Sequence, residues 1–439
     1  MGRTNMRSRW RVLAAALLAT GVMVGPVAVP ALADGSIRTD QWHLDAMHAP
    51  EMWKVSKGQG VTVAVVDGGF KLDHPDLVGQ FLPGKDFSGS SGGVGSYTDG
   101  HGTQMASLIA GSGKNQGGGG AYGLAPAAKI LPLKINNGSV MPLVTADFLE
   151  QIGQAVAYAA DQGAKVISIS QGMDSVPASP EDVAKLNRIL AAARAKGVLV
   201  VAAVGNEAQS GNPVEYPGAL PNVVGVGAVD RDGTVTAESE QGPQVALVAP
   251  GIDMIAACTA PSGYCKGHGT SDATALVSAS AALVWSVHPD WTANQILRVL
   301  INTAGKSSDG AIRNNDAGYG AVRPRIALTS PGDPGPADVS PIPVPEASVS
   351  AVPSPSASPS AGASSAPSSA APSPSDVAVG APPVEPRAEK SAGSGGALPV
   401  VAGVVGGLVL VAGVVFVVLR RRKAGGRPVV PPGEDPYVR

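Results

Sequence analysis

Short apolar runs alternate with longer amphipathic runs through residues 61–330. The short runs predict β-strands, and the runs with apolar positions three or four apart predict helices. The strands are predicted at 61–66, 129–134, 165–170, 198–204, 223–228 and 244–248. The helices are predicted at 104–110, 146–160, 181–196, 272–288 and 292–303. Strands that are apolar along their whole length are typical of a parallel sheet covered on both faces by helices. The pattern therefore predicts a doubly wound α/β fold.

An apolar segment near the N-terminus lies outside this pattern. Residues 12–29 are mostly apolar, follow several arginines and precede the small-residue motif Ala-Leu-Ala at 31–33. This order is typical of an export signal peptide, predicted at 1–33, although such a run could also form a buried helix. Removing the signal would leave a short extension at 34–60. We expect no large prodomain, because this extension is too short to fold as one.

A second apolar segment, 398–419, carries no charge and is long enough to cross a membrane as a helix. Four basic residues follow at 420–423, so the tail 420–439 is predicted to be cytoplasmic and the fold to lie outside. Residues 331–397 are dominated by Pro, Ser and Ala, which predicts a disordered tether. The sequence thus predicts a single-pass protein of the cell membrane.

Composition narrows the possible partners. The chain of 439 residues has a formal net charge of −2 and 4% aromatic residues, so neither nucleic acid nor a sugar surface is indicated as a ligand. Its two cysteines, Cys258 and Cys265, favour a disulfide in an exported protein. A metal site at this pair would need further ligands, of which His268 is the nearby candidate.

Four polar residues lie in motifs that suit nucleophilic catalysis. Asp67 ends the first predicted strand, His101 lies in Gly-His-Gly-Thr before a helix, Asn206 follows another strand, and Ser271 begins a helix. Asp67 and Asn206 fall at the carboxyl edge of the sheet, where such folds bind ligands. A serine nucleophile needs a base, a group that orients the base, and donors for the oxyanion.

Each of these residues also has a structural explanation. Asp67 could cap a turn, His101 could be a structural histidine, Asn206 could form a turn, and Ser271 could be a helix cap. A second His-Gly-Thr motif begins at His268, but it lies too close in sequence to the serine for its ring to reach the hydroxyl. The order of the four residues, each with its flanking motif, favours catalysis.

With these motifs the chain resembles the subtilisin-like serine peptidases from about residue 42 to 304. The same region contains His-Pro-Asp-Leu at 74–77, Gly-Leu-Ala-Pro at 123–126 and His-Pro-Asp-Trp-Thr at 288–292. The export signal, tether and anchor make the layout similar to that of the mycosins, membrane-anchored subtilases associated with type VII secretion in actinobacteria. The resemblance implies a subtilisin-like fold and proteolysis by acyl transfer.

The resemblance also implies roles for individual residues. His101 would take the proton of Ser271, Asp67 would hold the imidazole, and Asn206 with the Ser271 N–H would stabilise the oxyanion. The substrate backbone would pair with two edges of the chain. One edge would be formed by Ser170, Gln171 and Gly172, and the other by the segment from Asn136 to Gly138.

Three positions depart from the family pattern. Asp272 follows the nucleophile, where many relatives carry Met or another apolar residue. We expect its charge to lower intrinsic activity or to favour basic substrate residues just after the cut. Gln171 replaces the usual Leu, which makes that wall more polar, and Ala275 replaces the usual Pro, which lets the helix run straighter.

We therefore expect an extracytoplasmic serine endopeptidase that acts on protein or peptide substrates and needs no cofactor. Calcium stabilises many members of the superfamily, but the sequence contains no convincing ligand cluster. The alternative is a structural or regulatory part of a type VII-like secretion complex, in contact with other secretion proteins and with a little-used active site. A carbohydrate- or wall-binding module on a stalk would explain the tether but none of the four motifs.

Overall fold

The computed structural model describes residues 36–138, 144–176, 178–306 and 310–343. These residues belong to one compact unit of the chain. The predicted signal peptide, the predicted membrane segment at 398–419 and most of the predicted tether lie outside the described residues. Within the described ranges, no helix has both the length and the apolar character needed to cross a membrane.

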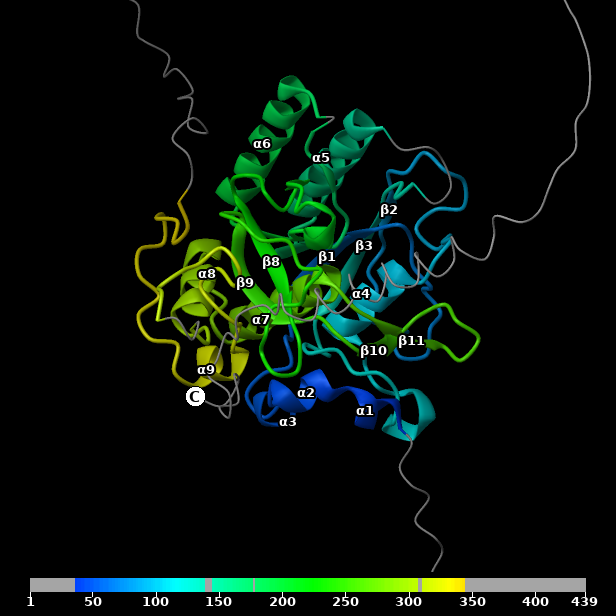
Figure 1. Cartoon of the computed structure of the whole chain (residues 1–439). Helices are drawn as coiled ribbons and strands as arrows, with labels where there is room; N and C mark the ends of the chain where they lie inside the picture. Colours follow the sequence, from blue (N-terminus) through cyan, green and yellow to red (C-terminus); the bar gives the residue numbers. More distant parts are fainter. Residues whose placement is uncertain (1–35, 139–143, 177, 307–309, 344–439) are drawn as a thin grey trace, which may run out of the picture. The chain divides into compact units, whose positions relative to one another are not determined.

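The centre of this unit is a seven-stranded sheet with the strand order β2-β3-β1-β4-β6-β8-β9 (Figure 1). Every neighbouring pair in it is parallel. All the predicted strands are in this sheet, so the predicted α/β fold with a parallel sheet is confirmed. The strands are β1 Thr62–Asp67, β2 Lys85–Asp86, β3 Lys129–Lys134, β4 Val166–Ile169, β6 Leu199–Ala203, β8 Val223–Val229 and β9 Val245–Pro250.

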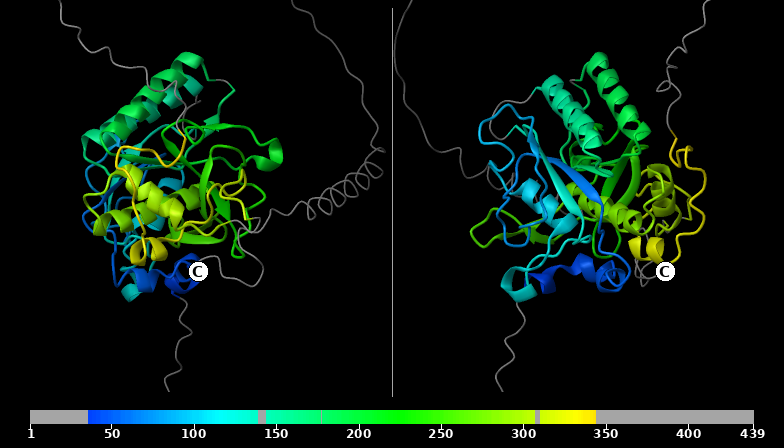
Figure 2. Two further views of the ribbon diagram at one scale, coloured as in Figure 1. Left: turned by 90° about the vertical axis from the view of Figure 1, so that its left-hand side faces the viewer. Right: turned by 180° about the vertical axis from the view of Figure 1, so that it is seen from behind.

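Helices cover both faces of the sheet (Figure 2). Helices α5 (Thr145–Asp161) and α6 (Pro180–Ala195) pack on one face, and α4 (His101–Ala110) and α7 (Thr270–Val287) pack on the other. Strand side chains alternate between the faces. In β1, for example, Val63 and Val65 join the core with α4 and α7, whereas Ala64 and Val66 join the core with α5 and α6.

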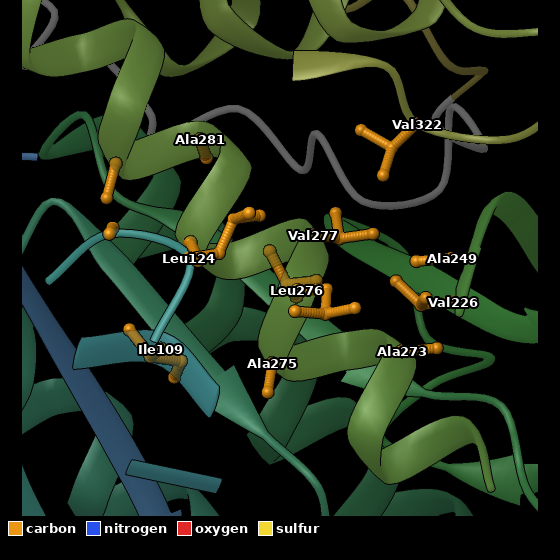
Figure 3. Close-up of a cluster of buried hydrophobic side chains, with 14 of the residues drawn as sticks. Ile109, Leu124, Val226, Ala249, Ala273, Ala275, Leu276, Val277, Ala281 and Val322 are labelled. Atoms are coloured by element: carbon orange, nitrogen blue, oxygen red, sulfur yellow. The ribbon is translucent and has the colours of Figure 1, made fainter. Parts of the chain in front are cut away.

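Helix α7 passes through the middle of one core. Every residue from Thr270 to Trp285 in it is buried, so the helix has no polar stripe. Its small side chains allow close contact with the sheet, and Figure 3 shows Leu276 and Val277 in the same buried cluster as Val226 of β8. The buried hydroxyl of Ser280 donates to the carbonyl oxygen four residues earlier. This packing fixes the start of α7 relative to the strand ends.

The short N-terminal extension is part of the fold. The buried Gln41 donates from Nε2 to the carbonyl oxygens of Tyr122 (2.8 Å) and Ile255 (3.1 Å). Trp42 donates from its indole to the carbonyl oxygen of Ile252 at 3.0 Å. These bonds join the extension to segments far away in sequence. The extension contains three short helices, α1 Ile37–Asp40, α2 Trp42–Ala46 and α3 Ala49–Met52.

Two small antiparallel pairs of strands complete the unit. Strand β5 (Met173–Asp174) pairs with β7 (Glu215–Tyr216), and β10 (Met254–Ala257) pairs with β11 (Tyr264–Gly267). Cys258 and Cys265 form a disulfide across the second pair. Such short strands have no hydrophobic period of their own, which is why the sequence pattern did not predict them. Two short 3₁₀ helices also occur, η1 Asn115–Gly118 and η2 Ala208–Ser210.

The C-terminal helices α8 (Ala293–Asn302) and α9 (Pro324–Thr329) precede a proline-containing segment that packs on α8. Arg298 of α8 donates to the carbonyl oxygens of Pro334 at 2.7 Å, Pro336 at 3.0 Å and Val339 at 2.6 Å. The expectation that a disordered tether begins at residue 331 is therefore wrong for residues 331–343. The reason is that proline lacks an N–H but keeps its carbonyl, and a guanidinium can bind several such acceptors.

Candidate active site

Asp67 and His101 are brought together by β1 and α4. Asp67 is the last residue of β1 and is fully buried, and His101 is the first residue of α4. His101 Nδ1 lies 3.0 Å from Asp67 Oδ1 and 2.9 Å from Asp67 Oδ2. Gly102 permits this approach, because a Cβ at that position would lie 3.0 Å from Asp67 Cβ and would collide with the carbonyl oxygen of Gly69. An ionised Asp67 makes Nδ1 the protonated nitrogen, which leaves Nε2 as the acceptor.

The carboxylate also changes the basicity of the imidazole. Burial lowers the pKa of His101, but the charge and hydrogen bond of Asp67 outweigh burial and raise that pKa to about 9. The negative charges of Asp272 and Asp99 act in the same direction. An imidazole with this pKa is a strong base whose neutral, proton-accepting form becomes more abundant as the pH rises.

Ser271 lies in the first turn of α7, next to the end of β4. Its hydroxyl donates to the carbonyl oxygen of Ser170 at 3.1 Å, and the Ser170 hydroxyl donates to the carbonyl oxygen of Ser271 at 3.0 Å. Within the described residues, the Ser271 hydroxyl has no hydrogen bond to His101. In enzymes of this kind, the bond between nucleophile and base often forms or tightens only when substrate binds.

Asn206 is held in one orientation by the residue before Ser271. Its Oδ1 accepts hydrogen bonds from the Thr270 N–H at 2.8 Å and from the Thr270 hydroxyl at 3.1 Å. The amide nitrogen Nδ2 is therefore left as a donor on an exposed side chain. Gly269 is required beside it, since its φ is +112° and a Cβ there would lie 2.9 Å from Asn206 Oδ1.

Gln171 contacts the Asp67–His101 pair directly. Its Nε2 donates to Asp67 Oδ1 at 3.0 Å and lies 3.1 Å from His101 Nδ1. The sequence predicted a more polar wall at this position. The structure places the Gln171 amide at Asp67 Oδ1, one of the two carboxylate oxygens that contact the imidazole.

The two expected substrate edges lie on either side of this pair. Gly172 is exposed and follows Gln171 directly, while Ser170 is buried below Ser271. On the other side, Asn136 is buried, and its Oδ1 accepts a hydrogen bond from the Gly138 N–H at 3.0 Å. The neighbouring Asn137 side chain lies against Gly68, directly after Asp67.

Asp272 is buried rather than exposed to substrate. Gln104 of α4 donates to its Oδ1 at 3.2 Å, while its Oδ2 has no hydrogen-bond partner within the described ranges. Burial raises the pKa of Asp272 to about 7, although the positive charge of His101 and the Gln104 hydrogen bond both lower it. The carboxylate thus interacts with His101 by charge. Gln104 lies one helical turn after His101, and sequence reasoning did not identify it.

His268 lies on the surface in an ion pair with Glu238, at 2.9 Å between Nδ1 and Oε1. The hydrogen bond and charge of Glu238 raise its pKa. Among the described residues, no group of three or more His, Cys, Asp or Glu side chains could hold a metal ion.

A family model described as the Subtilase family matches residues 58–320. The chain belongs to the subtilase family. It is 34% identical over 248 residues to an intracellular serine protease of Paenibacillus polymyxa, which covers 55% of this chain and 71% of the relative. It is also 34% identical over 269 residues to thermitase of Thermoactinomyces vulgaris, which covers 61% of this chain and 89% of the relative. The chain is thus a subtilisin-like serine protease.

Solved mycosin structures match the fold of this subtilase. MycP1 from Mycobacterium smegmatis superimposes with a TM-score of 0.59 and 27% identity, covering 68% of this chain and 86% of that one. MycP3 protease from the type VII (ESX-3) secretion system superimposes with a TM-score of 0.58 and 30% identity, covering 69% of this chain and 90% of that one. The resemblance to mycosins drawn from the sequence is confirmed.

Proposed function

We propose that this subtilase is a membrane-anchored serine endopeptidase that hydrolyses peptide bonds outside the cytoplasm through Ser271, His101 and Asp67. The observation that carries the proposal is the bond between the buried Asp67 carboxylate and His101 Nδ1, at 2.9 Å. This bond orients Nε2 as the acceptor, and α7 brings a serine to the same edge of the sheet. No cofactor is needed for the reaction.

In the first half of the reaction, Ser271 Oγ forms a bond to the carbonyl carbon of the substrate while its proton moves to His101 Nε2. Asp67 stabilises the imidazolium. The electron pair of the carbonyl double bond moves onto oxygen, where Asn206 Nδ2 and the Ser271 N–H at the start of α7 donate hydrogen bonds. The tetrahedral intermediate then collapses, the C–N bond breaks, and the leaving amine takes the proton from His101.

In the second half, water replaces the amine. His101 takes a proton from the water as the water oxygen bonds to the acyl carbon, and the new oxyanion forms at the same donors. The bond between that carbon and Ser271 Oγ then breaks, His101 returns the proton to Oγ, and the acid product leaves. Thr270 contributes indirectly, because its N–H and hydroxyl hold Asn206 Oδ1 and so fix where Nδ2 points. The raised pKa of His101 favours a rate that increases towards alkaline pH.

Labelling with a fluorophosphonate tests the activated serine. The full-length chain, purified with detergent present, is expected to be labelled, and Ser271→Ala is expected to abolish labelling. Ser330→Ala is the matched control, because it removes an exposed hydroxyl after α9 and leaves the nucleophile in place. A well-folded wild-type chain that is not labelled at any pH up to about 10, where the imidazole is neutral, would refute the proposal.

Anchoring is supported by the sequence of segments outside the described residues. The export signal at 1–33 and the uncharged segment at 398–419 would place the peptidase domain outside the cytoplasm and the tail 420–439 inside. Protease added to intact cells is expected to digest an epitope inserted near residue 345 but not one at the C-terminus. Digestion of both epitopes in intact cells would contradict this topology.

A second candidate function is a structural or regulatory role in a type VII-like secretion complex. It is favoured by similarity to a MycP1 structure described as an essential component of the type VII (ESX-1) secretion system, at 29% identity and a TM-score of 0.58. Deletion of the gene, complemented either by the wild type or by Ser271→Ala, separates the two roles. Full complementation by Ser271→Ala would support the structural role.

A further inference from the structure

Two glutamates, Glu215 and Glu240, lie beside the glycines that follow β4 and β6, close to the candidate active site. A Cβ on Gly172, just beyond β4, would collide with Glu215 Oε2. A Cβ on Gly205, just beyond β6 and directly before Asn206, would collide with the carboxyl group of Glu240. The two carboxyl groups therefore occupy the space that side chains at these glycines would take. We refer to Glu215 and Glu240 as the acidic pair.

Glu240 is buried without a basic partner. Its side chain is 0% exposed, and among the described residues its carboxyl group meets only the Glu215 carboxyl group and the Glu207 backbone. Within the residues that the structure describes, neither Glu215 nor Glu240 forms an ion pair with Lys, Arg or His. A buried charge without an opposite charge beside it is strongly unfavourable, so such a site favours a cation from outside.

The surroundings of the acidic pair are also negative. Asp174 lies opposite Glu215 in the β5–β7 ladder, and Glu207 follows Asn206. Burial raises the pKa of Glu215 to about 7 and the pKa of Glu240 to about 8. The charge of Glu215 raises the pKa of Glu240 further, and the carboxylates of Asp174 and Glu207 raise the pKa of both. The contact between the two carboxyl groups lowers the pKa of Glu215, and the Glu207 backbone lowers that of Glu240. A proton shared by the pair compensates part of this charge when no other cation is present.

The position of the acidic pair indicates which substrate residue it would contact. The attacked carbonyl carbon must lie at Ser271 Oγ, and its oxygen must face Asn206 Nδ2. The side chain of the residue that carries this carbonyl would extend between Gly172 and Gly205, towards the two carboxyl groups that lie beside these glycines. Glu215 is half-buried and Gly172 is exposed, so an incoming side chain can reach the carboxylate.

We propose that the acidic pair binds a lysine or arginine side chain of the substrate residue whose carbonyl Ser271 attacks, so that the enzyme cuts after basic residues. This inference rests on the proposed function, since it assigns specificity to that site. Lys and Arg present several N–H donors on a long apolar stem. They would supply the positive charge that Glu240 lacks, together with several hydrogen-bond donors. Loss of one charge-assisted hydrogen bond of this kind changes binding by about 10- to 100-fold.

A divalent cation is the competing ligand for such a pair. It would require several oxygen ligands arranged around one point. No cluster in the described residues meets the requirement for a metal site, although four carboxylates lie in this region. The observations therefore favour a side-chain cation, and the metal becomes an outcome of the test.

The test uses the full-length chain with detergent present and two peptide 4-nitroanilides, Ala-Ala-Pro-Lys and Ala-Ala-Pro-norleucine. These peptides share the apolar stem and differ in the ammonium group. We expect kcat/KM for the lysine peptide to exceed that for norleucine by about 10- to 100-fold. Glu215→Gln and Glu240→Gln should each reduce this ratio by about tenfold or more. Glu51→Gln, an exposed glutamate in α3, is the matched control and should leave the ratio unchanged.

Fluorophosphonate labelling is measured on the same samples, because it requires the reactive serine but no basic side chain. If the wild-type enzyme is labelled normally but has a higher kcat/KM for the norleucine peptide than for the lysine peptide, the specificity proposal alone is overturned. The absence of labelling and of all cleavage would overturn the proposed function and the specificity with it. Ca²⁺ binding that calorimetry detects in the wild type and not in Glu240→Gln would assign the acidic pair to a metal and also overturn the proposal. If Glu240→Gln does not fold, the wild-type ratio and Glu215→Gln decide.

Discussion

The clearest test of the electrostatics around the nucleophile is Asp272→Asn. Asp272 is 1% exposed, accepts one hydrogen bond from Gln104 and has a second oxygen without a partner among the described residues. Asparagine keeps the shape and the acceptor but removes the titratable charge. The change therefore separates the effect of a buried negative charge from that of packing.

The magnitude follows from the pKa of Asp272, which burial raises from 3.8 to about 7. A carboxyl group whose pKa is higher in the folded than in the unfolded chain destabilises the fold wherever it is ionised. This penalty is absent below the unfolded pKa of 3.8, grows as the pH rises, and is complete above about pH 7. Between about pH 4 and pH 8, the free energy of unfolding of the wild-type protein should fall by about 3–4 kcal/mol relative to that of the Asp272→Asn variant.

Urea unfolding at several pH values measures this difference. Both proteins should carry Ser271→Ala, so that unfolded chains are not digested by folded ones. The pH-dependent part is diagnostic, because the constant cost of an unpaired Asn amide cancels between pH values. Asp161→Asn, in an exposed ion pair with Lys196, is the control and should change little. The measured quantity is the difference in the free energy of unfolding between the two proteins at each pH. If this difference changes by less than about 1 kcal/mol between pH 4 and pH 8, the reasoning is refuted.

Three further predictions concern the site and the disulfide. Asn206→Ala should lower kcat by about 10²–10³-fold with a small change in KM, as measured with a peptide 4-nitroanilide, because it removes a donor made for the oxyanion; a change confined to KM would contradict that role. Asp67→Asn should lower kcat by about 10⁴-fold and move the midpoint of the rising limb of kcat/KM to lower pH, because Asp67 raises the pKa of His101; an unshifted pH profile would count against this. Replacing Cys258 and Cys265 by alanine should lower the free energy of unfolding by about 2.5 kcal/mol in the Ser271→Ala background, since it opens a loop with a sequence separation of 7; equal urea midpoints would exclude it.

The strands and long helices were predictable because each is long enough to carry its own hydrophobic period. The boundaries of helices were less predictable where the helices carry candidate catalytic residues. Helix α4 begins at His101 rather than at residue 104, and α7 begins at Thr270 rather than at residue 272. Glycine and polar residues in these first turns have weak helix propensity, and their contacts with Asp67 and Asn206 hold them in place instead. Local preference is overridden there by tertiary contacts.

The segments at the ends of the unit show the same limit. The three short helices at residues 37–52 and the packed segment at 331–343 have little periodicity. They are ordered by single side chains, such as Gln41 and Arg298, that bond to distant carbonyl groups. Nothing local in the sequence indicates which glutamine or arginine will find such partners.

The sequence by itself determined the fold class and named the residues that meet at the candidate site. It could do so because buried parallel strands are continuously apolar, and because chemistry at a strand end or helix start leaves short motifs of small residues. Only the tertiary structure decided which charges face one another. Glu215 and Glu240 lie 25 positions apart in the chain and in no motif, yet the fold brings them beside Gly172 and Gly205, at the ends of β4 and β6. Electrostatic interactions depend on distance and burial in space, which the order of residues along the chain does not specify.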